Sequence, residues 1–276
     1  MASVSGYLNE QADFYTPKRD YLDAARNRRS AIESRLDKDL TVTTFIETGS
    51  LTHGTGLWLY SDVDYFVRFY DQRPTPTTAL QRIKSSMQAL YPNTYIRISS
   101  PAVKLTFSAG VSVELVPAYA TGTDELYYIP DPTDSSKWML SGPQKHLKYV
   151  NEANRHQSET KKVARLLKLW KAKRNVPVSS FYLEMRTAQY MKTQYTPVGV
   201  MDGLGGVMSA MVKDKMAGFL DPTFTAGFID PTSTSNYHVE ALSKLNTASS
   251  HLLISTIEDL GGDKLGAIAT LRKVFE

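Results

Sequence analysis

Three short segments in the first half of the chain alternate between apolar and polar residues, which is the pattern of half-buried β-strands. In residues 62–69 the odd-numbered positions are apolar, so Asp62 and Asp64 share the opposite face. Residues 103–107 and 111–117 alternate in the same way. We therefore expect a sheet that buries one face of each strand and carries polar side chains on the other.

The last two of these strands are predicted to form a hairpin, because Ser108-Ala109-Gly110 between them is a turn sequence. On the second strand Glu114 lies opposite the apolar set Val111, Val113 and Leu115. Lys104, on the first strand, could steer a phosphate, but we interpret it as an exposed hairpin lysine.

Helical periodicity predicts one helix before the strands and several after them. The first begins at Thr16-Pro17, a good N-cap and first-turn pair. Its apolar stripe is Leu22, Ala25, Ile32 and Leu36, and its arginines, which we expect to be solvated, are Arg26, Arg28 and Arg29. Residues 195–221 are read as a helix start or a flexible edge, and residues 238–275 as helices.

A helix is also predicted over residues 159–174. The residues on its apolar side are Val163, Leu166, Leu167 and Trp170. The opposite side is basic, with Lys161, Arg165 and Lys168, and by itself indicates a solvated face.

Composition narrows the class of protein. The chain has 276 residues, of which 42% are hydrophobic and 22% charged, enough to bury a sizeable core. It has no apolar run that would span a bilayer and no signal pattern, so a cytoplasmic location is expected. It has no cysteine, which excludes disulfides and a cysteine zinc ribbon, and its five histidines lack metal-ligand spacing. The net charge of +4 suits polyphosphate or nucleic acid equally well.

The candidate chemistry begins with the aspartate pair. Two carboxylates side by side repel each other unless a cation lies between them, and oxygen ligands of this kind suit Mg²⁺ held together with nucleotide phosphates. Upstream, Gly49-Ser50 offers a tight turn whose N–H groups and hydroxyl can cradle phosphate. Taken singly, the aspartates would equally suit a solvated face or a calcium site, and Gly-Ser an ordinary turn. Their order along the chain favours the nucleotide site.

The arrangement of Gly-Ser followed by Asp-x-Asp on a strand resembles polymerase-beta-like nucleotidyltransferases. That family adds a third carboxylate from a later strand, for which Glu114 is the candidate. The order of later motifs resembles the bacterial cGAS/DncV-like nucleotidyltransferases (CD-NTases). These motifs are Val116-Pro117-Ala118, Tyr127-Tyr128-Ile129-Pro130-Asp131, Trp138, Pro143-Gln144-Lys145-His146, Asn151-Glu152-Ala153-Asn154, Arg165-Leu166-Leu167-Lys168-Leu169-Trp170, Ser179-Ser180-Phe181-Tyr182-Leu183-Glu184 and, more loosely, Asp230-Pro231.

The resemblance implies an α/β (α+β) fold with a polymerase-beta-like core, a mixed sheet and a helical C-terminal lobe. We expect residues 1–140 to form the catalytic lobe, including a bracing N-terminal helix, and residues 141–276 the helical lobe that closes the nucleotide cleft. The implied reaction condenses NTPs into a cyclic di- or trinucleotide second messenger, with loss of pyrophosphate, in anti-phage (CBASS) signalling. The product would act on a separate effector protein.

The resemblance also implies site residues. Two Mg²⁺ or Mn²⁺ ions would be held by Asp62, Asp64 and Glu114. Lys168 and Ser180 would bind the triphosphate, and Phe181 would stack on a base. Gly49 and Ser50 complete the predicted nucleotide-binding set.

Two alternatives stay open: a nucleotidyltransferase that tails RNA or modifies another acceptor, and a catalytically silent nucleotide-binding module.

Animal relatives use a zinc insertion to bind DNA, and this chain has no cysteine that could build one. We therefore expect no duplex DNA requirement and no membrane association. A regulatory protein partner is left open.

Overall fold

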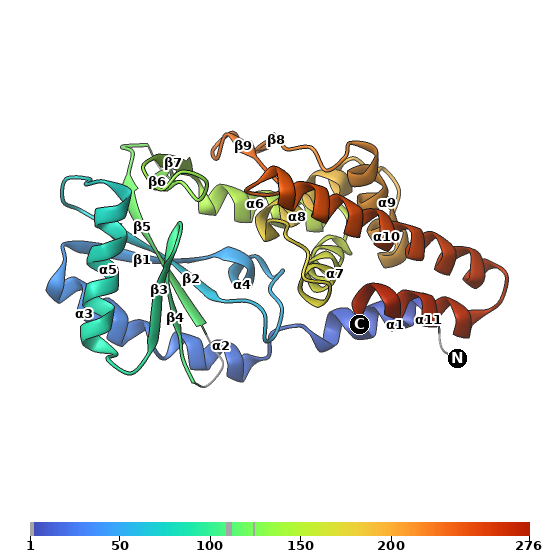
Figure 1. Cartoon of the computed structure of the whole chain (residues 1–276), viewed down its shortest axis with the longest axis horizontal. Helices are drawn as coiled ribbons and strands as arrows, with labels where there is room; N and C mark the ends of the chain where they lie inside the picture. Colours follow the sequence, from blue (N-terminus) through green and yellow to red (C-terminus); the bar gives the residue numbers. More distant parts are fainter. Residues whose placement is uncertain (1–2, 109–111, 124) are drawn as a thin grey trace. The chain divides into compact units, whose positions relative to one another are not determined.

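The computed structural model describes residues 3–108, 112–123 and 125–276 (Figure 1). Contacts divide the chain into two units. The sheet unit comprises residues 17–147 and 225–227; the helical unit comprises the segment up to Thr16 with residues 148–224 and 228–276. The sequence predicts a boundary at 140 and places the N-terminal segment in the catalytic lobe, whereas here the segment up to Thr16 belongs to the helical unit.

In the described part of the chain, the sheet unit contains a seven-stranded sheet. Its strands are β1 (Val42–Thr48), β2 (Val63–Phe69), β3 (Tyr95–Ser99), β4 (Ala102–Thr106), β5 (Ser112–Ala120), β6 (Tyr127–Pro130) and β7 (Trp138–Ser141). Its helices are α2 (Arg19–Arg26), α3 (Arg29–Asp39), α4 (Gly49–His53), α5 (Pro76–Leu90) and the start of α6 (Pro143–His156).

The sheet is mixed, as predicted. The strand order is β1-β2-β5-β4-β3, and β6, paired with β7, joins the far half of β5. β2 and β5 run parallel, whereas the other neighbours are antiparallel. The antiparallel pairing of β4 with β5 confirms the predicted strand pair, while Ala109 and Gly110 of the predicted turn and Val111 of the predicted second strand lie outside the described residues.

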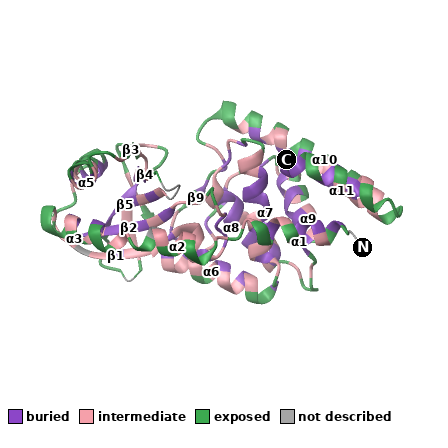
Figure 2. Ribbon diagram, turned by 90° about the horizontal axis from the view of Figure 1, so that it is seen from below, coloured by how far each residue is buried: buried purple, intermediate pink, exposed green. Residues whose placement is uncertain are grey.

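The alternation read from the sequence corresponds to the buried faces of the strands. Val63, Tyr65, Val67 and Phe69 all belong to the main core of the sheet unit, together with apolar residues of α3 and α5. A smaller apolar cluster around Phe66 covers part of the other face. Figure 2 shows β2 and β5 as largely buried strands. Because five of its seven residues are buried, the core fixes the position of β2 and of Asp64 on it.

The prediction of a single N-terminal helix is wrong, and the arginines that we expected to be solvated all have partners, although the Arg26 side chain is 48% exposed. The chain forms α1 (Val4–Phe14), α2 and α3 instead, and α2 ends before Asn27, a residue type that favours helix ends. The arginines bind within the sheet unit: Arg26 pairs with Glu47 at 2.9 Å, and Arg29 donates to the Phe45 carbonyl at 3.1 Å. Arg28 lies over the Phe107 ring, 4.2 Å from its centre. They join the helices to strand residues.

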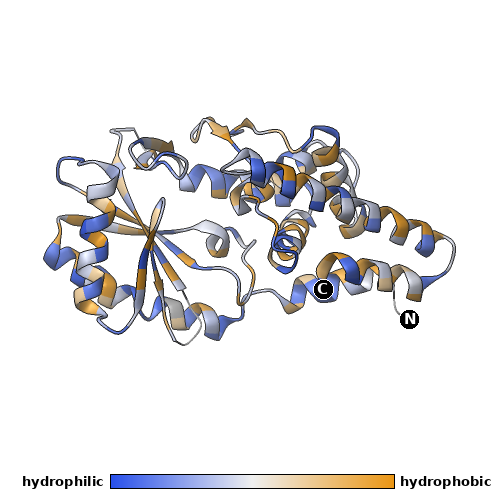
Figure 3. Cartoon of the chain, viewed as in Figure 1, coloured by the Kyte–Doolittle hydropathy of each residue, from blue (hydrophilic) through white to orange (hydrophobic). Residues whose placement is uncertain are grey.

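The helical unit consists of α1, most of α6, and the elements α7 (Thr160–Lys173), α8 (Ser180–Lys192), α9 (Val200–Lys213), β8 (Phe219–Leu220), β9 (Phe228–Ile229), α10 (Ser235–Leu260) and α11 (Lys264–Phe275). α7 confirms the helix predicted over 159–174, and α10 and α11 confirm those predicted after 238. Apolar and polar stretches alternate along α10 and α11 (Figure 3), as expected of helices that bury one side.

The glycine-rich segment between 195 and 221 forms helix α9. Gly203 is buried, and a Cβ added there would lie 3.0 Å from Val163 of α7, so the missing side chain allows close packing of these helices. No helix among the described residues has the length and apolar character that crossing a bilayer requires.

Candidate active site

Three carboxylates gather at one end of the parallel strand pair. Asp64 lies on β2 directly beside Glu114 on β5, and Asp62 immediately precedes β2. All three are partly buried, and their strand neighbours face the core as predicted. Parallel strands begin at the same edge of a sheet, so the register brings together carboxylates that are fifty residues apart in the sequence.

A lysine lies between two of these carboxylates. Lys104 on β4 is in register with Glu114, and its Nζ hydrogen-bonds to Asp62 and lies 3.3 Å from Glu114 Oε1. The side chains of Lys104, Asp62 and Glu114 are only 21, 22 and 26% exposed. The interpretation of Lys104 as an exposed hairpin lysine is wrong, because its alternation places it on the same face as Glu114 of the adjacent strand.

The site strongly favours an added positive charge or a proton. Burial, followed by the negative charge of Asp62, raises the pKa of Glu114 to about 7, although Lys104 opposes the shift. Burial alone would lower the pKa of Lys104, but its hydrogen bond to Asp62 and the charges of both carboxylates outweigh this and raise it. Repulsion between carboxylates is therefore relieved by one lysine and by proton uptake at Glu114.

Gly49 and Ser50 do not form the isolated tight turn that was predicted but lie in the first turn of the short helix α4, where Gly49 packs against Asp64. Gly49 has a φ of +75°, and a Cβ there would lie 1.8 Å from Asp64 Oδ2, so only glycine fits this position. The hydroxyl of Ser50 donates to Ser61 Oγ at 3.2 Å, and Ser61 Oγ accepts the Leu57 N–H at 2.8 Å. Because Ser61 precedes Asp62, this network ties the turn to the start of β2.

The three carboxylates are a donor set that suits a divalent cation. In the structure, however, two of them, Asp62 and Glu114, are arranged around Lys104. Across residues 3–108, 112–123 and 125–276, no group of three His, Cys, Asp or Glu side chains is positioned to hold a metal ion. Asp62 and Glu114 converge on Lys104, while Asp64 lies against Gly49. Oxygen donors in a site that already attracts a cation are the chemistry that Mg²⁺ and Mn²⁺ prefer.

In the helical unit, Lys168 does not lie on a solvated face. It is 5% exposed and forms an ion pair with Glu184 of α8, which is 3% exposed. The prediction of an exposed basic side is wrong at this position, because α8 covers it with a carboxylate. Sequence periodicity along one helix carries no information about a partner on another.

The lysine beside Ser180 is Lys171, which the sequence reasoning missed. Lys171 Nζ donates to Ser180 Oγ at 2.6 Å, and burial, followed by the charge of Lys168, lowers the Lys171 pKa to about 8. Phe181 follows Ser180 in the first turn of α8 and is half-buried rather than part of the core. The spacing of Lys171 from Lys168, about one helical turn, was the signal available in the sequence.

Replacing Lys104 should expose its role as the resident cation. In Lys104→Met we expect a lower melting temperature without metal, because Asp62 and Glu114 then repel each other. We also expect half-saturation by Ca²⁺, followed by thermal shift, at about tenfold lower concentration, since hydrogen bonds to charged groups are worth roughly 1.5–3 kcal/mol. The control is Lys137→Met, whose 71%-exposed side chain pairs with Asp134. Equal Ca²⁺ titrations for Lys104→Met and wild type would contradict this assignment.

Glu114 should make the metal-free protein less stable as pH rises. Its folded pKa of about 7 exceeds its ordinary value of 4.5, so the folded state binds a proton that the unfolded chain releases. The resulting stability is fully present below pH 4.5 and is lost as pH rises through about 7. In EDTA, melting temperatures measured between these limits should fall more steeply for wild type than for Glu114→Gln. The exposed Glu10→Gln should follow wild type; parallel curves for all three proteins would refute the shift.

Comparison with known proteins agrees with this geometry. Residues 3–154, more than half of the chain, match the Second Messenger Oligonucleotide or Dinucleotide Synthetase (SMODS) domain. The CBASS oligonucleotide cyclase CdnC of Escherichia coli (strain KTE188) is 27% identical over 190 residues, which are 63% of this chain and 60% of that protein. The chain thus matches less than two thirds of that relative's length.

Two solved structures share the fold across almost the whole chain. The structure of E. coli MS115-1 CdnC with ATP has a TM-score of 0.76 and 16% identity, covering 100% of this chain and 99% of that one. A complex of the same CdnC with HORMA-deltaN gives 0.74 and 15%, covering 99% of both chains. At these identities the likeness concerns the fold, and the sequence match carries the assignment. The chain belongs to the SMODS domain family, among the cGAS/DncV-like nucleotidyltransferases whose motifs its sequence resembles.

Proposed function

We propose that this chain is a metal-dependent nucleotidyltransferase that condenses NTPs into a cyclic di- or trinucleotide and releases pyrophosphate, in anti-phage (CBASS) signalling. The observation that supports it best is the register of Asp64 with Glu114, with Asp62 beside them and Lys104 between two of the three carboxylates. This site attracts cations at the edge of a rigid sheet, and it occurs in a chain of the SMODS family.

Asp62, Asp64 and Glu114 are the proposed ligands of two Mg²⁺ or Mn²⁺ ions. Bound metal would activate the attacking 2′- or 3′-hydroxyl and neutralise charge on the α-phosphate and the leaving pyrophosphate. For these carboxylates to take up metal, Lys104 must leave its position between Asp62 and Glu114, and Glu114 must lose its proton. The displaced ammonium of Lys104 is then available to a phosphate of the substrate.

The remaining proposed roles concern substrate binding. The Gly49-Ser50 turn, packed on Asp64, offers N–H groups and a hydroxyl to phosphate. In the helical unit we propose that Lys171 and Ser180, 2.6 Å apart, bind phosphate and that the half-buried Phe181 stacks on a base. The family resemblance assigns Lys168 to the triphosphate. Its buried ion pair with Glu184 supports a structural role instead, so Lys168 and Lys171 are tested together.

The proposed partners are NTP substrates and a separate effector protein that senses the product. The CdnC neighbour was solved with a HORMA protein, so a HORMA-domain protein is the class of regulatory partner that we propose for this chain. Assays of activity therefore include reactions with and without such a protein.

Removing the two aspartate charges should abolish synthesis without unfolding the protein. Bound metal supplies several kcal/mol of transition-state stabilisation, so Asp62→Asn/Asp64→Asn should lower the rate by about a thousandfold or more. The assay incubates the protein with four NTPs and Mg²⁺, then applies phosphatase and mass spectrometry. Asp37→Asn, an exposed aspartate of α3, is the control.

The products distinguish the alternatives. Phosphatase-resistant cyclic products that disappear in the double variant support the proposal. Linear tails favour the RNA-tailing enzyme, and unchanged NTPs in every reaction, including those with a partner, favour the silent binding module. Wild-type rates from a folded double variant would end the carboxylate assignment.

Lys168 and Lys171 should behave differently when replaced. Lys168→Met removes the ammonium that neutralises the buried Glu184 carboxylate, at a cost of about 3–5 kcal/mol, and Lys168→Met/Glu184→Leu should restore the melting temperature. Lys171→Met should keep the fold but raise the KM for NTP by about tenfold, as expected for a lost charged hydrogen bond of roughly 1.5 kcal/mol. A raised KM in the stable Lys168→Met/Glu184→Leu variant would instead make Lys168 a nucleotide ligand.

A further inference from the structure

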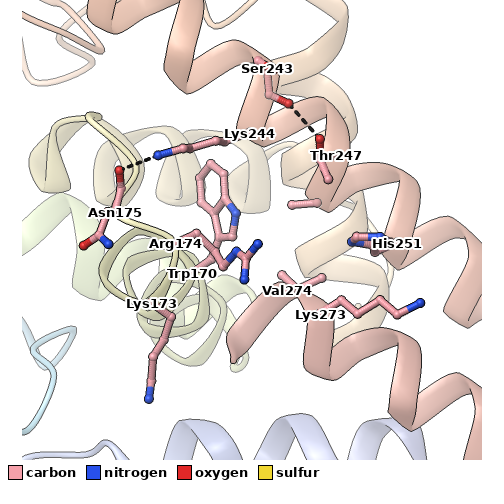
Figure 4. Close-up of a pocket in the computed structure, with 11 residues that line it drawn as sticks. Trp170, Lys173, Arg174, Asn175, Ser243, Lys244, Thr247, His251, Lys273 and Val274 are labelled. Carbon is pink, nitrogen blue, oxygen red and sulfur yellow. Dashed lines mark hydrogen bonds between the residues drawn. The ribbon is translucent and has the colours of Figure 1, made fainter.

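A basic pocket lies within the helical unit, and its residues are remote in sequence from the three carboxylates. Figure 4 shows a pocket that is bounded by the C-terminal end of α7 and by α10 and α11. Its volume is about 350 Å³, within the range of roughly 300–1,000 Å³ typical of small-molecule sites. Trp170, which is only 1% exposed, forms part of its wall. The pocket is therefore a hollow with a rigid side, large enough for a small ligand.

The lining carries positive charge. Five basic side chains line the pocket: Lys173, Arg174, Lys244, His251 and Lys273. The lining residues that the structure describes include no aspartate or glutamate. Placing lysines and an arginine around one hollow is electrostatically unfavourable, and an anion that binds there relieves the repulsion.

Some of these groups already have partners. Lys244 Nζ donates to Glu240 at 2.6 Å and to the Asn175 carbonyl at 2.9 Å, and Lys173 lies over the Tyr15 ring. These contacts hold the wall in place.

Other donors are available to a ligand. Among the described residues, Arg174 and Lys273 form no ion pair, and His251 Nδ1 is buried with no hydrogen-bond partner. A buried nitrogen left without a partner destabilises the fold, and a hydrogen bond to a ligand atom would remove that cost. The three donors come from three different helices, so one ligand would contact α7, α10 and α11 together.

We propose that this pocket binds a small phosphate-bearing anion, through Arg174, Lys273 and His251. Guanidinium and ammonium groups around a hollow suit phosphate oxygens, and the limited volume selects a compact ligand such as a nucleotide or an inorganic polyphosphate over a nucleic-acid duplex, which needs an extended row of phosphate contacts. The site goes beyond the proposed catalytic function, because none of its residues belongs to the proposed catalytic set.

The pocket connects to the proposed nucleotide-binding residues through α7. Trp170, Lys173 and Arg174 flank the turn that contains Lys171, so an anion held here would fix the end of the helix that positions Lys171 against Ser180. Occupation of the pocket would thus stabilise the packing of α10 and α11 on α7, and its effect is measurable as binding without turnover.

The test measures binding in EDTA, so that metal-dependent catalysis plays no part. Isothermal titration of the full chain uses tripolyphosphate, a non-hydrolysable ATP analogue and a short DNA duplex in separate experiments. The test variant is Arg174→Ala/Lys273→Ala, and the matched control is Arg155→Ala/Arg272→Ala, which removes the same charge from exposed positions outside the pocket. A third variant, His251→Leu, removes the buried nitrogen.

We expect the test variant to bind tripolyphosphate at least about tenfold more weakly than wild type, as the loss of roughly 1.4 kcal/mol implies, while the control binds as wild type does. His251→Leu should also weaken binding.

The relative affinities identify the ligand. Equal affinity for tripolyphosphate and the ATP analogue identifies phosphate alone as the recognised group. Tighter binding of the analogue, lost in the test variant, identifies a nucleotide. Both outcomes support the site. Absence of tripolyphosphate binding, equal loss in the control, or an effect confined to the duplex would overturn it. Because no turnover is measured, failure here leaves the proposed catalytic function unaffected.

Discussion

The parallel pairing of β2 with β5 is the constraint on which the candidate active site depends. These two strands, far apart in sequence, begin at the same edge of the sheet, and the register of their pairing places Asp64 beside Glu114. Burial of alternate side chains fixes that register, since a slip by one residue would turn Val63, Tyr65 and Val67 out of the core. The hydrophobic core and the carboxylate site are thus two consequences of one alternation.

Gathering carboxylates in this way creates an electrostatic cost, and the structure shows how it is met. Lys104 binds Asp62 and Glu114, and Glu114 favours its protonated form. Gly49 contributes differently, because the missing side chain lets the turn approach the Asp64 carboxylate. The charge of the carboxylates is thus offset by a lysine on a flexible stem and by a proton, and not by a rigid guanidinium that is always charged.

The strands, the helices and the polar faces could be predicted from the sequence because they depend on local periodicity, whereas the mixed sheet and the third carboxylate were predicted from the family resemblance. Strand alternation placed Asp62 and Asp64 on one face of their strand and Glu114 on the polar face of a later one, and helical periodicity found α7, α10 and α11. The errors concern partners in other elements: Glu184 buries Lys168, the carboxylates bind Lys104, and Glu47 binds Arg26. The sequence of one helix or strand does not show which side chain of another element will contact it. Lys171 was overlooked for the same reason, since only the position of Ser180 distinguishes it from Lys168.

Helix α7 combines three kinds of interaction because an α-helix turns by about 100° per residue. Lys168 and Lys171 project from neighbouring positions around its axis and meet α8, through Glu184 and Ser180 respectively. Trp170, Lys173 and the C-cap residue Arg174 line the basic pocket at the end of the same helix. The buried Lys168–Glu184 pair holds α7 against α8. Because Lys171 and Arg174 are separated by about one helical turn, a displacement of the end of α7 that moved Arg174 would also move Lys171 relative to Ser180.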